Sequence, residues 1–148
     1  MYAGRMSQPI IKTHNVSILL YHIVCPAKYR RAIFDDLVTA ELKEICQDIQ
    51  DRYEIEFLEI GTDSNHVHFL IQSVPSYSPK KLVQTIKSIT ARELFQRCPQ
   101  IKEQLWGGAL WTEGYFVSTV GQHGTEAVIA KYVREQGGQT DTTQLDLF

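Results

Sequence analysis

The segment that decides the fold is His66-Val67-His68-Phe69-Leu70-Ile71-Gln72-Ser73, a largely apolar run that follows a short polar stretch. Successive side chains of a strand point to opposite faces, so Val67, Phe69 and Ile71 share one face while the two histidines share the other. The preceding residues 61–65 read GTDSN, a composition typical of a turn. Residues 53–60 alternate apolar and acidic side chains, which is the pattern of a partner strand. The sequence therefore predicts a β-hairpin here.

Outward from this hairpin, residues 16–24 form a run rich in Val, Ile and Leu that Cys25-Pro26 ends, which is typical of a buried strand. Residues 30–50 have the three- and four-residue apolar spacing of an amphipathic helix, given by Phe34, Leu37, Val38, Leu42, Ile45 and Ile49. A second helix is expected from Ser78-Pro79, an N-cap followed by a first-turn proline, to about Arg97. Its apolar stripe is Leu82, Val83, Ile86, Ile89 and Leu94.

Two further elements follow. Residues 109–120 predict a long strand, bent or bulged at Gly114, and Thr125 can cap a last short helix that Gly137-Gly138 ends. The order strand, helix, strand, strand, helix, strand predicts an α+β, ferredoxin-like βαββαβ fold. In that fold two helices cover one face of an antiparallel sheet, and here an extra C-terminal helix follows. For 148 residues we expect one domain over residues 1–138 and a flexible tail over residues 139–148.

The cysteines and the N-terminus indicate the compartment. Cys25, Cys46 and Cys98 are odd in number and too far apart for a CxxC pair, so we expect buried thiols in a reducing environment. Residues 1–13 lack the apolar core of a signal peptide, and no run of about 18 apolar residues could span a bilayer. These features predict a cytoplasmic protein with no membrane partner.

The formal net charge of −2, from 15 basic and 17 acidic residues, at first argues against a nucleic-acid partner. However, residues 35–59 hold nine acidic and two basic side chains, a balance of −7, which leaves +5 for the rest. The candidate DNA contacts are the basic residues after the first strand and along the second helix, namely Lys28, Arg30, Arg31, Lys80, Lys81, Lys87 and Arg92. A solvated helix face is the alternative. Nearby aromatics that could stack on unpaired bases, if not in the core, are Tyr77, Trp106, Trp111 and Tyr115.

Two further patterns indicate residues that could bind a metal ion or act as a nucleophile. His66 and His68 on one face of a rigid strand can share a metal ion, because each imidazole offers a lone pair; solvated strand histidines are the alternative. Tyr132 and Gln136 are four residues apart and so lie on one face of the last helix. A tyrosine oxygen can act as a nucleophile and a glutamine carbonyl can bind a hard metal ion, but a tyrosine packed in the core fits the same spacing.

Five ordered segments together resemble the single-tyrosine HUH (His, hydrophobic, His) transposases of the smallest bacterial insertion sequences, the IS200-like transposase family. The segments are Tyr21-His22-Ile23-Val24 leading into Lys28-Tyr29-Arg30-Arg31, then Asn65 to Ile71, Ser78 to Val83, Leu105 to Gly121, and Tyr132 with Gln136. The resemblance as a whole runs from about Val16 to Gln136, which is most of the chain.

The resemblance implies that His66, His68 and Gln136 bind Mg²⁺ or Mn²⁺ and that Tyr132 is the nucleophile. In that reaction the phenol displaces a 3′ oxygen of single-stranded DNA and leaves a 5′-phosphotyrosine, which a second 3′-OH later attacks. Two imidazoles make Mn²⁺ at least as suitable as Mg²⁺. Residues that could assist the metal, among which spacing does not choose, are Asp63, Asn65 and Glu113.

The resemblance also implies partners. With one such tyrosine per chain, two coordinated cleavages need a homodimer, which in this family recognises DNA hairpins and places the tyrosine helix of one subunit beside the histidines of the other. Residues 121–124 are the expected hinge. The last residues resemble the peptide with which bacterial replication proteins dock on the sliding clamp, with a tail of chance sequence as the alternative: Gln144, Leu145, Asp146, Leu147 and Phe148.

Two other functions fit the same sequence. One is a related transposase domesticated by the host, acting on chromosomal repeat hairpins, which genomic flanks would distinguish. The other is a non-catalytic nucleic-acid-binding module of the same fold, in which the histidines and Tyr132 only contact DNA or pack in the core.

Overall fold

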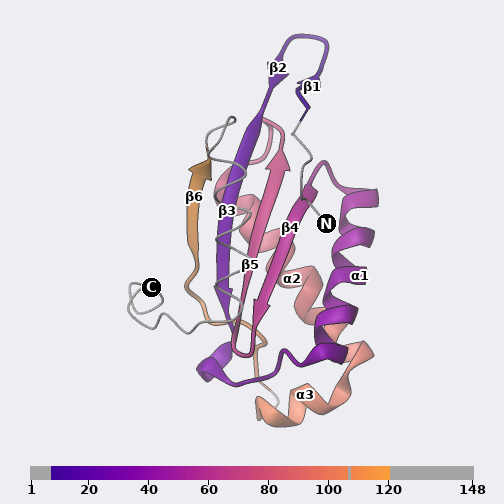
Figure 1. Cartoon of the computed structure of the whole chain (residues 1–148), viewed down its shortest axis with the longest axis vertical. Coiled ribbons are helices and arrows are strands. Elements are labelled where there is room, and N and C mark those ends of the chain that lie inside the picture. Colours follow the sequence, from indigo (N-terminus) through magenta and orange to yellow (C-terminus); the bar gives the residue numbers. More distant parts are fainter. Residues whose placement is uncertain (1–7, 107, 121–148) are drawn as a thin grey trace.

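The computed structural model describes residues 8–106 and 108–120 (Figure 1). A four-stranded antiparallel sheet has the order β4-β5-β3-β6. Its strands are β3 (Leu19–Pro26), β4 (Glu56–Asp63), β5 (His66–Ser73) and β6 (Phe116–Val120). The helices α1 (Asp36–Arg52) and α2 (Pro79–Arg97) cover one face of this sheet (Figure 1). This order and topology confirm the α+β, ferredoxin-like prediction.

Smaller elements flank this unit. The strands β1 (Ile10–Ile11) and β2 (Val16–Ser17) form a two-stranded extension before β3. A 3₁₀ turn, η1 (Lys28–Arg30), follows β3, and a short helix, α3 (Pro99–Gln104), follows α2. The helix α3 was not predicted from the sequence. Across the described ranges, none of the helices is long and apolar enough to cross a membrane.

The side chains of β5 alternate between two buried faces of the sheet, as its sequence predicts. It pairs with β3 from Leu19↔Ser73 to Pro26↔His66 and with β4 on its other side, so all eight of its residues are buried. Val67, Phe69 and Ile71 join the main core with the apolar faces of α1 and α2. On the opposite face, Leu70 packs with Leu20 and Leu58 in a smaller cluster, and His66 and His68 share this face.

The first helix begins later than its apolar spacing indicates. Residues 30–35 lie outside it, because Asp35 is the N-cap and its carboxylate accepts a hydrogen bond from the Val38 amide at 2.9 Å. Just before it, Tyr29 and Arg30 have positive φ angles of 58° and 51°, which a helix cannot contain. Leu37 is 58% exposed and lies outside the stripe, while the other five apolar residues are buried.

The strand boundaries also differ from the sequence prediction. α1 extends to Arg52, so β4 spans Glu56–Asp63, and residues 61–63 belong to the strand and not to the turn. The last strand is short and begins at Phe116, while Trp111 forms an isolated bridge with Ala27. The predicted helix with Tyr132 and Gln136, the hinge at 121–124 and the tail at 139–148 lie outside the described residues.

Two other predictions are confirmed. The Ser78 hydroxyl caps α2 by accepting a hydrogen bond from the Lys81 amide at 3.1 Å, with Pro79 in the first turn, and all five residues of its apolar stripe are buried. Cys25, Cys46 and Cys98 are free and buried. Burial raises the pKa of each thiol, so the cysteines behave as small apolar residues.

The cap of α1 can be tested by substitution. Asp35→Ala removes the acceptor for the Val38 amide and should lower the free energy of unfolding in urea by about 1 kcal/mol. Asp36→Ala is the matched control, because Asp36 lies in the first turn of α1 but is not its N-cap, and its interaction with the helix dipole is worth roughly 0.3 kcal/mol. Equal losses for the two variants would contradict the assignment of Asp35 as the cap.

Candidate active site

His66 and His68 are adjacent on the face of β5 that points away from the helices. Their ring centroids are 4.8 Å apart and the rings are inclined at 68°. Both side chains are buried, with exposed fractions of 1% and 2%. The reading of solvated strand histidines is therefore wrong, because neither ring is in contact with bulk water.

Each of the two imidazoles has a partner at its Nδ1 atom. The Nδ1 atom of His66 lies 2.8 Å from the Oδ1 atom of Asn65, the residue before it in the turn. The Nδ1 atom of His68 lies 3.2 Å from the Nε2 atom of His22 on β3. His22 also stacks on His68, with centroids 5.5 Å apart and the planes at 13°, and its other side meets the edge of Phe116.

The sequence alone predicts no role for His22. Its position on β3 places it on the face of Leu20, and the register Val24↔His68 brings it diagonally next to His68. Alternation along residues 16–24 could have assigned that face to His22. The contact itself depends on the pairing of two strands that are 46 residues apart, which a single sequence does not reveal.

Burial keeps this cluster uncharged at neutral pH. It lowers the pKa of His22 to about 4 and that of His68 to about 3, with a further lowering at His68 from the charges of His66 and His22. Burial also lowers the pKa of His66; Asp63 opposes this shift and Arg30 adds to it. The neutral form is the one in which an imidazole offers a lone pair to a metal ion.

The partners select the nitrogen that can bind a metal. A neutral imidazole has one N–H group and one lone pair, so a ring that donates from Nδ1 keeps its lone pair on Nε2. The Asn65 carbonyl accepts from His66, and His22 can accept from His68 in the same way. Such outer partners are how proteins orient metal-binding histidines. The donor set therefore fits a divalent cation held by two Nε2 atoms.

Two histidines make only part of a metal site. Within the described ranges, no group of three or more His, Cys, Asp or Glu side chains is arranged to hold a metal ion. Gln136, the third expected ligand, and the nucleophile Tyr132 lie outside those ranges. Asp63 faces His66 across the hairpin; its Oδ1 atom accepts from the Ser64 amide at 2.7 Å, and its buried Oδ2 atom has no hydrogen-bond partner within them.

The candidate DNA contacts fall into separate groups. Lys28, Arg30 and Arg31 follow β3 directly, and Pro26 pairs with His66, so this group adjoins the histidines. Lys80 and Lys81 are exposed in the first turn of α2, which follows the Ser73 end of β5, whereas His66 lies at the other end. Arg92 is exposed farther along α2.

The ammonium group of Lys87 contacts three carbonyl groups of the chain itself. It lies within 2.6, 3.3 and 3.4 Å of the carbonyl oxygens of Thr112, Glu113 and Gly114, in the loop that leads into β6. The ring of Tyr115 lies 5.6 Å from the same nitrogen. Lys87 therefore fastens this loop to α2, and Glu113 belongs to the fastened loop.

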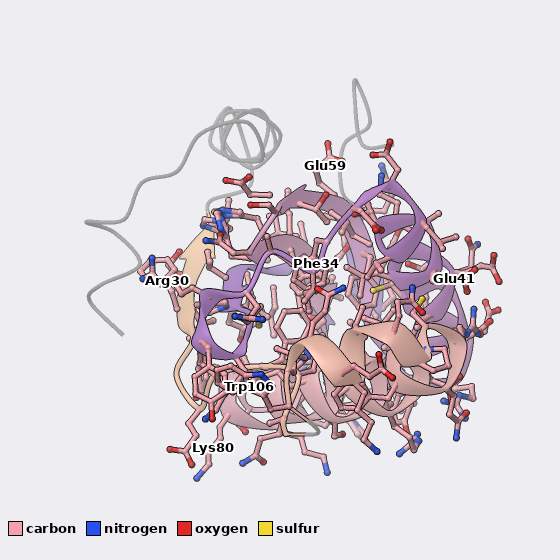
Figure 2. All side chains as sticks on the ribbon, turned by 90° about the horizontal axis from the view of Figure 1, so that it is seen from below. Arg30, Phe34, Glu41, Glu59, Lys80 and Trp106 are labelled. Atoms are coloured by element: carbon pink, nitrogen blue, oxygen red, sulfur yellow. The ribbon has the colours of Figure 1, made fainter. Side chains whose placement is uncertain are left out.

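Ion pairs connect α1, which contains many of the acidic residues, to α2. Arg97 at the end of α2 forms ion pairs with Glu41 at 3.2 Å, Glu44 at 3.1 Å and Asp48 at 3.3 Å on α1. Figure 2 shows Glu41 on the opposite side of the molecule from Arg30 and Trp106. Glu41, one of the acids paired with Arg97, thus lies away from Arg30.

Comparison with known proteins identifies the family of the chain. The family model described as "Transposase IS200 like" matches residues 15–136. The ISDra2 transposase TnpA of Deinococcus radiodurans is 36% identical over 118 residues, which cover 80% of this chain and 84% of that protein. The transposase for insertion sequence element IS200 of Salmonella typhimurium is 27% identical over 116 residues, or 78% and 75% of the two chains.

Two solved structures share the fold of this chain. A crystal structure of a Deinococcus radiodurans R1 protein assigned as a transposase superposes with a TM-score of 0.70 at 32% identity, covering 86% of this chain and 97% of that one. A REP-associated tyrosine transposase bound to a REP hairpin has a TM-score of 0.57 at 9% identity over 86% and 70% of the two chains, so this likeness shows the fold alone.

The matched relatives are transposases, a class of enzyme that cuts and transfers DNA strands. The chain belongs to the IS200-like transposase family.

The role of Lys87 can be separated from DNA binding. Lys87→Met removes the donor for three loop carbonyls and should lower the free energy of unfolding by about 1 kcal/mol, measured in urea. Lys80→Met, at an exposed position of the same helix, should leave stability unchanged. If Lys87→Met were as stable as the parent and bound DNA less tightly, its assignment to the loop would be wrong.

Proposed function

We propose that this transposase cleaves and rejoins single-stranded DNA at the ends of an insertion sequence, in a metal-dependent reaction that passes through a 5′-phosphotyrosine at Tyr132. The observation that carries the proposal is the pair of buried, neutral imidazoles whose Nδ1 atoms both have partners. Such a pair is costly to bury for packing alone and is suited to ligation through Nε2.

The described residues supply orientation and charge. His66 and His68 would hold Mg²⁺ or Mn²⁺ together with Gln136, and Asn65 and His22 keep the two rings in place. A bound divalent cation supplies neutralisation of a non-bridging phosphate oxygen, which otherwise repels an incoming anion. The carboxylate of Asp63 faces His66 and adds negative charge that favours a cation there.

The chemical step conserves the phosphodiester bond energy. The Tyr132 phenol oxygen forms a bond to phosphorus and loses its proton, while the bond from phosphorus to the 3′ oxygen breaks and that oxygen leaves as a 3′-OH. The 5′ end remains as a phosphotyrosine. Attack by a second 3′-OH reverses the exchange and restores the Tyr132 hydroxyl, so the reaction consumes no nucleotide cofactor.

The proposal extends to partners. A homodimer with active sites shared between subunits would supply the two tyrosines that paired cleavages need. A hairpin in single-stranded DNA is the proposed substrate, which the hairpin bound by the REP-associated relative of the same fold supports. Docking of residues 144–148 on the replication sliding clamp, and action in the cytoplasm, complete the proposal.

A covalent-adduct assay tests this function. The full-length protein is mixed with a labelled hairpin-bearing single strand and Mn²⁺, and the denatured products are separated by electrophoresis. We expect a labelled protein band that Tyr132→Phe abolishes while its DNA affinity is unchanged, because only the nucleophilic oxygen is removed. If the unmodified protein binds such hairpins and forms no adduct, the non-catalytic binding module is the better account.

The histidines can be tested separately from the tyrosine. His66→Ala and His68→Ala should each abolish the adduct and leave hairpin affinity unchanged, because binding relies on basic residues outside the pair. Equal losses of binding and cleavage would contradict this division of roles.

His22 acts as a positioning residue in this account. His22→Leu should weaken Mn²⁺ binding by the DNA-free protein about 10- to 100-fold, because the Nδ1–H group of His68 loses its acceptor. His22→Gln, whose amide oxygen can accept that hydrogen bond, should restore most of the affinity in a Mn²⁺ titration followed by electron paramagnetic resonance. Equal affinities of the Leu and Gln variants would show that His22 only fills space.

A further inference from the structure

An exposed aromatic pair lies where η1 meets the segment after α3. Tyr29 is 58% exposed and Trp106 is 73% exposed, and their ring centroids are 5.5 Å apart with the planes inclined at 48°. Large aromatic side chains contribute most to stability when they are removed from water. Trp111, five residues later, does this: it is 4% exposed and stacks on Phe34. The Tyr29–Trp106 pair contributes little to the core by comparison.

A basic side chain lies over each ring of the pair. The ammonium nitrogen of Lys28 lies 5.4 Å from the centroid of Tyr29, and the guanidinium carbon of Arg31 lies 5.1 Å from the centroid of Trp106. The Nε atom of Arg31 also donates to the carbonyl of Gln104 at 3.0 Å, which ties η1 to the end of α3. Residues 26–34 contain three basic side chains and no acidic one. The pair is therefore both aromatic and strongly positive.

The backbone under the pair is held in an unfavourable conformation. The non-glycine residues with positive φ in the described part of the chain are Tyr29 at 58°, Arg30 at 51° and Trp106 at 55°, all within this cluster. Backbone hydrogen bonds fix them there: the Lys28 amide donates to Leu110 at 2.8 Å and the Trp106 amide to Glu103 at 3.1 Å. Strain of this kind persists where the surrounding structure enforces it, and it gathers at binding sites.

The segment that leads into η1 and Tyr29 begins beside His66. Ala27, which precedes η1, donates its amide hydrogen to the carbonyl of Asn65 at 2.9 Å, and Pro26 pairs with His66. Figure 2 shows Arg30 and Trp106 on the same side of the molecule and the acidic Glu41 on the other. The chain therefore runs from the residue paired with His66 directly into the positive segment that carries Tyr29.

We propose that Tyr29 and Trp106, with Lys28 and Arg31, form a binding site for one unpaired nucleotide of single-stranded DNA, whose base stacks on the exposed face of Trp106 while the cations attract its phosphate. The proposal rests on the proposed function and adds a residue-level contact to it. A paired base in a duplex has both faces covered by its neighbours, so this site selects unpaired bases. It reads no sequence, because every base has a π face.

The test compares single-stranded and duplex DNA. The full-length protein is titrated into a labelled short oligothymidine, which forms no hairpin, and into a blunt duplex of the same length, with anisotropy as the readout. Trp106→Leu should weaken binding of the oligothymidine about 5- to 150-fold, the range for loss of one base–aromatic stack, and leave duplex binding unchanged. Trp106→Phe should retain most of the affinity. Oligothymidine should quench tryptophan fluorescence in the parent but not in Trp106→Leu, whose remaining Trp111 is buried.

The matched control is Tyr53, an exposed aromatic residue with a guanidinium over its ring. Tyr53 is 38% exposed, with the Arg52 carbon 5.8 Å from its centroid at the end of α1, and Tyr53→Leu should leave the affinity for oligothymidine unchanged. Equal effects of Trp106→Leu and Tyr53→Leu, or equal losses for single-stranded and duplex DNA, would overturn the proposal. A Trp106 effect in a protein that forms no adduct at Tyr132 would leave this site standing and reject strand transfer instead.

Discussion

The antiparallel pairing of β3 with β5 is the constraint on which the rest of the molecule depends. Eight consecutive residue pairs, from Leu19↔Ser73 to Pro26↔His66, fix which side chains of each strand share a face. One face supplies Ile23, Cys25, Val67 and Phe69 to the core beneath the helices. The other face brings His22 against His68. A slip of one residue would move the histidines into the core, so stability and site geometry depend on one register.

The same pairing explains where a slightly acidic chain places its positive charge. The end of β3 that pairs with His66 leads directly into Lys28, Tyr29, Arg30 and Arg31, so positive charge and an exposed ring are delivered next to the imidazoles. Three acidic side chains of α1, those of Glu41, Glu44 and Asp48, form ion pairs with Arg97 on α2. The net charge is therefore a sum over segments of opposite charge, the acidic residues 35–59 and the basic residues after β3.

The sequence predicted those parts of the fold that local pattern determines. Alternation in residues 66–73 gave β5 with its correct boundaries, and Ser78-Pro79 gave the start of α2. Apolar spacing could not place the start of α1, because the Asp35 cap and the positive φ angles at Tyr29 and Arg30 override it. The histidine pair followed from spacing. The contact of His22 with His68 and the pairing of Tyr29 with Trp106 join distant segments, so no local pattern reveals them.

The central claim is that the β5 histidines hold a divalent cation through their Nε2 atoms. It is tested most directly by electron spin-echo envelope modulation on Mn²⁺ bound to protein labelled with ¹⁵N-histidine. The account predicts coupling of Mn²⁺ to directly bound imidazole nitrogens of two histidines, reduced to one in His66→Ala and in His68→Ala. Mn²⁺ that binds with no coupling to histidine nitrogen, or with coupling unchanged in both variants, would contradict it.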